Sequence, residues 1–135
     1  MQENKLFILQ GETLKYFQRI IYALKNIIIN QISEENKLQT SQILRMPLKS
    51  VMKRLSRIDL NSVYDLLNEE EIQVFKYLPG HYNFVVERSH LEYTYIIEPG
   101  LYEKKLEYVI SRTEYIKKQL IPLTYKLESI AFATL

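Results

Sequence analysis

The chain has 135 residues, and its 18 lysines and arginines against 16 aspartates and glutamates give a formal net charge of +2. A charge this small does not by itself indicate a polyanionic partner. The absence of cysteine excludes disulfides, thiolate catalysis and cysteine-ligated zinc. A chain of this length can bury a sufficient core without such supports, so we expect one domain spanning residues 1–135.

The sequence shows no targeting signal and no long apolar run. Residues 1–5 lack the basic flank and the small-residue cleavage site of a signal peptide. The most apolar stretch, 20–29, is interrupted by Lys25 and Asn26, which makes it too polar for a membrane-spanning helix. We therefore expect a cytoplasmic protein that does not enter a membrane.

A first long helix is predicted to begin at Thr13, a suitable N-cap residue. Gly11 separates it from a short apolar run at 5–9, which could be an N-terminal strand or a frayed lead-in. After Thr13, apolar side chains recur three and four residues apart and cover about half of the helix circumference, so we expect neighbours on two sides. These residues are Leu14, Tyr16, Phe17, Ile20, Ile21, Leu24, Ile27 and Ile28.

The region from 33 to 58 is predicted to contain short helices, the last of which is basic. One helix begins near Ser33, and Pro47 separates it from a helix over 47–57. Apolar residues lie on one face of this second helix and basic residues on the other.

The next stretch, 59–75, has five acidic residues and no basic one. It predicts two short helices, one ending near Leu67 and one capped by Asn68 with three glutamates in its first turn. One interpretation is that the basic helix is solvent-exposed and meets this acidic stretch, in the same chain or in a second copy.

Residues 40–55 resemble a helix-turn-helix motif, with a short first helix, a tight turn at Met46 and Pro47, and a basic second helix. The resemblance implies a DNA-binding regulator whose second helix enters the major groove. The candidate contacts to DNA or to an acidic partner are Arg45, Lys49, Ser50, Lys53, Arg54 and Arg57.

An antiparallel β-hairpin is predicted at 82–97, after Pro79 and Gly80 stop the helices. The apolar spacing changes there from three and four residues to two. Folding the chain around 88–89 gives one wholly apolar and aromatic face, and such a hairpin could serve as the wing of a DNA-binding domain. The pairs on that face are Val86 with Leu91, Phe84 with Tyr93, and Tyr82 with Tyr95.

The last third, from Gly100 onward, has the most regular apolar spacing and predicts a long amphipathic helix. Pro122 interrupts the pattern without shifting it. We expect either a helix that ends near Leu120 and a second that begins at Pro122, or one helix kinked at the proline. The apolar face comprises Tyr102, Leu106, Val109, Thr113, Ile116, Leu120, Leu123, Leu127 and Ile130.

Signatures of catalysis are close to absent from the sequence. The three glycines, Gly11, Gly80 and Gly100, are too far apart for a phosphate-binding loop or a dinucleotide fingerprint. The two histidines, His81 and His90, fall near opposite ends of the predicted strands, which argues against a shared metal ion. We therefore expect no catalytic, cofactor-binding or metal-binding residue, and a protein that is not an enzyme.

Together these patterns predict an α+β, predominantly helical protein: two long amphipathic helices packed together, with several short helices and one antiparallel β-hairpin. We expect a non-enzymatic regulatory or adaptor protein that binds an unidentified protein, with a winged-helix-like DNA-binding regulator as the alternative. The long helices carry more apolar surface than one antiparallel contact can cover, so we also expect a homodimer. Its candidate interface residues are Tyr16, Ile20, Ile27, Tyr102, Val109, Ile116, Leu123 and Leu127.

Overall fold

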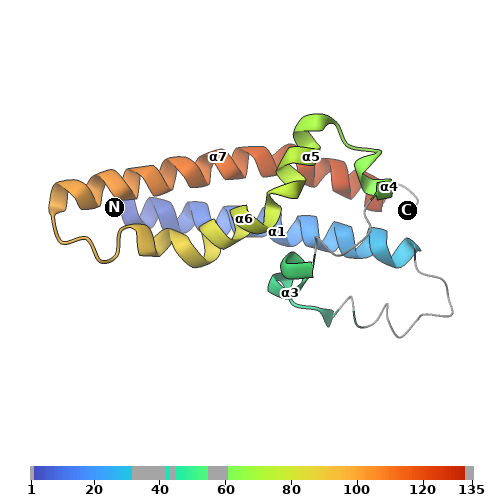
Figure 1. Ribbon diagram of the computed structural model, residues 1–135, viewed down its shortest axis with the longest axis horizontal. Coiled ribbons are helices and arrows are strands. Elements are labelled where there is room, and N and C mark those ends of the chain that lie inside the picture. Colours follow the sequence, from blue (N-terminus) through green and yellow to red (C-terminus); the bar gives the residue numbers. More distant parts are fainter. Residues whose placement is uncertain (1, 32–41, 43–44, 55–60, 133–135) are drawn as a thin grey trace.

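The computed structural model describes residues 2–31, 42, 45–54 and 61–132. It is an elongated helical bundle in which the two long helices, α1 (Gln2–Gln31) and α7 (Pro99–Ala131), lie side by side (Figure 1). A third helical segment, 78–92, returns along the half of this pair that contains the N-terminus. Three short helices come between α1 and this segment in the sequence: α3 (Leu48–Arg54), α4 (Asn61–Tyr64) and α5 (Glu69–Lys76).

The helices α1 and α7 run in the same direction, so the expected antiparallel contact is wrong (Figure 1). The helical segment between them accounts for this, because it runs back along the bundle and brings the start of α7 to the start of α1. The ion pairs between the two helices agree with this direction, because their residue numbers increase together along α1 and along α7. Those among the described residues join Lys5 to Glu114 at 3.5 Å, Glu12 to Lys117, and Arg19 to Glu128 at 2.6 Å.

Helix α1 begins at Gln2, so the predicted N-cap at Thr13 is wrong. Gly11 does not break the helix, because its φ is not positive, and Thr13 is buried within it. The Thr13 hydroxyl donates to the carbonyl oxygen of Leu9 at 2.7 Å, so the side chain has a partner inside the helix. Neighbours lie on more than one side of α1, as predicted: it packs against α7, α3 and the segment 83–88.

The predicted apolar face of α7 is confirmed. The predicted positions from Leu106 to Leu127, spaced alternately three and four apart, are all buried, including the polar Thr113, and the predicted end residues Tyr102 and Ile130 are half-buried. Pro122 lies inside one continuous helix and is exposed, which bears out one helix containing the proline rather than two helices. Because Pro122 has no N–H, it cannot donate to the carbonyl oxygen of Lys118 one turn earlier.

The predicted β-hairpin is wrong, and with it the α+β class: the described part of the chain contains no strand. Residues 78–92 form three consecutive short helices, each of a different type. These are α6 (Leu78–Tyr82), the π-helix η3 (Asn83–Arg88) and the 3₁₀-helix η4 (Ser89–Glu92).

A helical stripe explains why this segment does not form strands. Apart from Phe84, the buried positions from Phe75 to Tyr93 recur three and four residues apart, and one of them is the polar Ser89. The Ser89 hydroxyl donates to Val85 O at 2.9 Å and accepts from Gln10 Nε2 at 2.5 Å, so it is buried without an unpaired group. The full stripe comprises Phe75, Leu78, Tyr82, Val85, Ser89 and Tyr93.

Two expected boundaries in this region have different outcomes. Pro79 does not stop the helices but lies in the first turn of α6, where a missing N–H is tolerated. Asn68 caps α5 as predicted, because its side chain accepts from the Glu71 N–H while the Glu71 carboxylate accepts from the Asn68 N–H. The predicted helix start near Ser33 lies outside the described residues.

Candidate binding groove along α7

A surface groove of about 650 Å³ lies between α5 and α7. Two tyrosines border it, Tyr77 at the end of α5 and Tyr115 on α7, and they are 62% and 58% exposed. The half-buried Val74 supplies apolar surface to the lining, and Leu123 also lines the groove although it is only 1% exposed. The full lining is Asn68, Glu70, Glu71, Gln73, Val74, Tyr77, His81, Tyr115, Lys118, Gln119, Pro122 and Leu123.

A second cleft of about 310 Å³ adjoins the first, because Tyr77 and His81 line both. It lies between 77–92 and α7. We call the two clefts together the α7 groove. The second cleft is lined by Tyr77, Gly80, His81, Asn83, Phe84, Arg88, Glu92 and Arg112.

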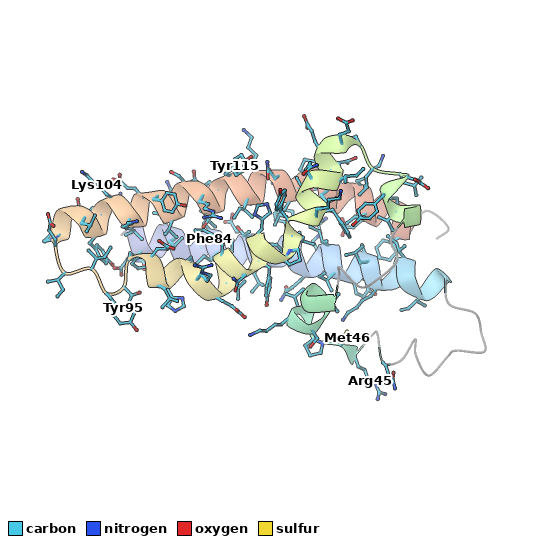
Figure 2. The ribbon with its side chains drawn as sticks, in the orientation of Figure 1. Arg45, Met46, Phe84, Tyr95, Lys104 and Tyr115 are labelled. Carbon is cyan, nitrogen blue, oxygen red and sulfur yellow. The ribbon has the colours of Figure 1, made fainter. Side chains whose placement is uncertain are left out.

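The side chains on α7 are held in place by contacts with one another and with η3. The Arg112 guanidinium lies 4.0 Å from the ring centroid of Phe84 and donates to the Tyr108 hydroxyl at 3.1 Å. Gln119 donates to the Tyr115 hydroxyl at 2.7 Å. In Figure 2, Phe84 lies between the helices and Tyr115 points outward from α7. The α7 groove is therefore built on ordered helical elements.

His81 is the titratable group at the junction of the two clefts. Burial lowers its pKa from the usual 6.5, and the positive charge of Arg112 lowers the pKa further. The imidazole is therefore neutral at pH 7, with one donor and one acceptor nitrogen. Its ring centroid lies 6.4 Å from that of Tyr77.

Of the six predicted contacts to DNA or to an acidic partner, the structure describes the side chains of Arg45, Lys49 and Ser50, and none of these three lines the α7 groove. Arg45 is exposed on a side of the molecule away from Tyr115 (Figure 2), and Ser50 is half-buried. Lys49 forms an ion pair with Glu87 at 2.6 Å, and this hydrogen bond raises the pKa of the lysine. The acidic partner of Lys49 thus comes from η3 and not from 59–71. The side chains of Lys53, Arg54 and Arg57 lie outside the described part of the structure.

Most of the predicted interface residues lie in the core of a single chain. The two exceptions are half-buried tyrosines: Tyr16, which packs under Arg19, and Tyr102, whose ring lies 5.7 Å from that of Tyr93. The six that the chain itself buries are Ile20, Ile27, Val109, Ile116, Leu123 and Leu127.

Sequence reasoning missed the α7 groove as a site. Of its lining residues only Leu123 was a predicted site residue, and most of the others lie outside the apolar stripes. A signal was nevertheless present: Tyr115 and Pro122, seven residues apart, are both exposed on α7 and both line the groove. The lining residues Asn83, Phe84, Arg88 and Glu92 of the second cleft fall within the predicted hairpin. The misassigned hairpin therefore concealed the second wall of the groove.

No group of three or more His, Cys, Asp or Glu side chains in the described residues could hold a metal ion. None of the helices in that part of the chain has the length and apolar character needed to cross a membrane.

Comparison of the chain with protein-family models, with curated proteins and with solved structures finds no match.

Proposed function

We propose that the protein is a non-enzymatic regulatory or adaptor protein that binds another protein through the α7 groove. The observation that carries this proposal is the pair of exposed tyrosines, Tyr77 and Tyr115, bordering a groove that also contains Arg112. Tyrosine and arginine are enriched among the residues that dominate binding energy at protein interfaces. The exposed tyrosines give a partner an anchor, and the half-buried Val74 beside them adds apolar surface for it to cover.

The shape of the groove favours a segment of polypeptide as the occupant. It follows α7 from Pro122 to Arg112, a distance of about 15 Å at the rise of an α-helix. This length accommodates about four residues of an extended segment or the exposed face of a short helix.

The lining of the groove supports binding rather than nucleophilic catalysis. In the described structure, no serine or threonine lines either cleft beside His81. A nucleophile within hydrogen-bond reach of a base is the usual signature of covalent catalysis.

The proposal includes self-association and a cytoplasmic location. Large apolar side chains are exposed near the tip of the bundle, including Tyr95 at 79% and Ile97 at 96%. A second copy would cover them, since monomers rarely expose extended apolar patches. Sedimentation equilibrium at micromolar concentration tests this part: a dimer that dissociates in the variant Tyr95→Ser/Ile97→Ser supports it, and a monomeric parent contradicts it.

Selection of peptides tests the binding function. A random phage-displayed peptide library would be panned against the full chain, and the selected peptides titrated into ¹⁵N-labelled protein. We expect amide shifts centred on Tyr77, His81 and Tyr115. Shifts centred on α3 or on the bundle tip, or a failure to select any peptide, would overturn the proposal.

A further inference from the structure

The two halves of the α7 groove differ in charge. The cleft beside η3 contains Arg88 and Arg112 against Glu92, which leaves one positive charge in excess while His81 is neutral. Among the described residues, neither arginine forms an ion pair. This cleft therefore presents positive charge that no ion pair within the described part of the chain neutralises.

The cleft beside α5 has the opposite balance. It contains Glu70 and Glu71 against Lys118. The Glu71 carboxylate already accepts the N–H of Asn68 at 2.9 Å, as part of the helix cap. The groove is thus polarised along α7, with its positive end at the arginines and its aromatic centre at Tyr77.

The Arg112 side chain is oriented before any ligand arrives. Its guanidinium lies over Phe84 at 4.0 Å, and one nitrogen donates to Tyr108 at 3.1 Å. A guanidinium has five N–H donors, so most remain for a ligand. A planar carboxylate is the group that matches this donor geometry, since it can accept two parallel hydrogen bonds.

We propose that the α7 groove recognises an acidic side chain within a segment of the partner protein, held by Arg88 and Arg112, with a neighbouring apolar side chain between Tyr77 and Tyr115. This inference rests on the protein-binding function proposed above. It defines the partner by its chemistry: an aspartate or glutamate next to a large apolar residue.

The carboxylate belongs to a side chain rather than to a chain terminus, because the exposed surface continues past the arginines. Beyond Arg112, Tyr108 is exposed on α7, and the Lys105 ammonium lies 5.9 Å from its ring centroid. A bound segment can therefore extend in both directions from its acidic residue.

Four peptide libraries test the inference. Three of them have a fixed central residue, which is glutamate, glutamine or lysine, and the fourth presents a free C-terminal carboxylate instead. Their binding to the full chain would be measured by fluorescence polarisation, together with a mixed single-stranded DNA oligonucleotide. The protein variants are Arg88→Gln, Arg112→Gln and Arg112→Lys. Lys104→Gln and Lys126→Gln are the matched controls, because both lysines are exposed on α7 outside the groove.

We expect the glutamate library to bind best and each arginine-to-glutamine change to weaken it about tenfold or more. Arg112→Lys should recover part of the loss, and the two controls should stay within about twofold of the parent. Arg88→Gln keeps the test decisive even where Arg112→Gln alters folding, since Arg88 is exposed.

Three results would overturn the inference. Equal binding of the glutamate and glutamine libraries in the groove would show that no acidic side chain is recognised, while the protein-binding function would still stand. Stronger binding of the C-terminal carboxylate library or of the oligonucleotide would show that the groove binds a chain terminus or a nucleic acid instead of an internal acidic residue. Failure of every library to bind would remove the proposed function as well.

Discussion

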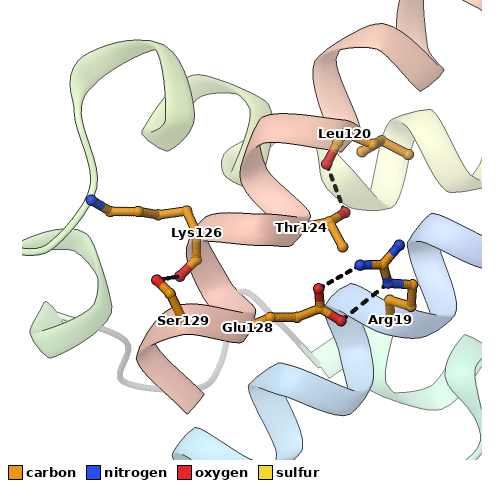
Figure 3. A network of polar contacts seen from close by, with 6 residues as sticks. All are labelled: Arg19, Leu120, Thr124, Lys126, Glu128 and Ser129. Carbon is orange, nitrogen blue, oxygen red and sulfur yellow. Dashed lines mark hydrogen bonds and ion pairs between the residues drawn. The ribbon is translucent and has the colours of Figure 1, made fainter. Parts of the chain in front are cut away.

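Arg19 of α1 and Glu128 of α7 form a bidentate ion pair: Arg19 Nε donates to Glu128 Oε2 at 3.0 Å and Arg19 Nη2 donates to Glu128 Oε1 at 2.6 Å (Figure 3). The guanidinium also packs against the rings of Tyr16 and Tyr125, at 5.4 and 5.2 Å. The pair joins the middle of α1 to the C-terminal part of α7, in agreement with the parallel register of the two helices.

A double-mutant cycle of Arg19→Gln and Glu128→Gln should give a coupling free energy of about 0.5 to 1 kcal/mol. The pair is partly exposed, with side-chain exposures of 37% and 27%, so solvent screens it. Urea unfolding at low and high salt measures the coupling, which should shrink as salt rises. Lys126→Gln serves as the control, and a coupling indistinguishable from zero at low salt would contradict the observed geometry.

Replacing Gly11 by alanine should raise the free energy of unfolding by about 0.5 to 1 kcal/mol. Gly11 lies inside α1 without a positive φ, and a Cβ there would meet no atom within 4 Å. Chemical denaturation measures the gain. A neutral or destabilising result would indicate that α1 begins after Gly11, as Thr13 alone suggested.

Val85 and Val86 distinguish the helical segment from the hairpin. Val85 is 2% exposed and Val86 is 38% exposed, whereas the hairpin register would put Val86 on the apolar face. Val85→Asp should therefore destabilise the protein by several kcal/mol, because it buries an unpaired charge, and Val86→Asp should cost much less. Thermal melting followed by circular dichroism gives the order, and the reverse order would support strands.

These corrections show which parts of the fold local sequence determines. The α7 stripe and the Asn68 cap were predictable, because each depends on spacings within one or two turns. The segment 82–93 was not, since its apolar residues fit both periods and Ser89 hides the helical stripe. Ser89 is buried with one local partner, Val85 O, and one distant partner, Gln10, which is 79 positions away, so part of its environment is tertiary.

The α7 groove could not be predicted from the sequence, for a related reason. Arg112 and Tyr115 follow the exposed face of α7, where periodicity carries no information about neighbours. Their position beside His81 depends on the return of 78–92 along the bundle (Figure 1). The parallel direction of α1 and α7 follows from the same return.

The lowered pKa of His81 predicts a pH-dependent stability. Below pH 6.5 the unfolded chain binds a proton at this position more readily than the folded chain, so stability falls as pH drops through 6.5 toward the folded pKa and then levels off. Urea unfolding at pH 7.5 and 5.5 should show a larger loss for the parent than for His81→Asn. His90→Asn is the control and should behave like the parent; equal losses in the parent and in His81→Asn would refute the assignment.

The most direct test of binding through the α7 groove compares two tyrosines on the same helix. Tyr115 borders the groove and Tyr125 does not, yet their exposures, 58% and 56%, are nearly equal. The affinity of a selected peptide should fall about tenfold or more in Tyr115→Ala and stay within about twofold of the parent in Tyr125→Ala. Equal affinities for the two variants, or a larger loss in Tyr125→Ala, would contradict the account.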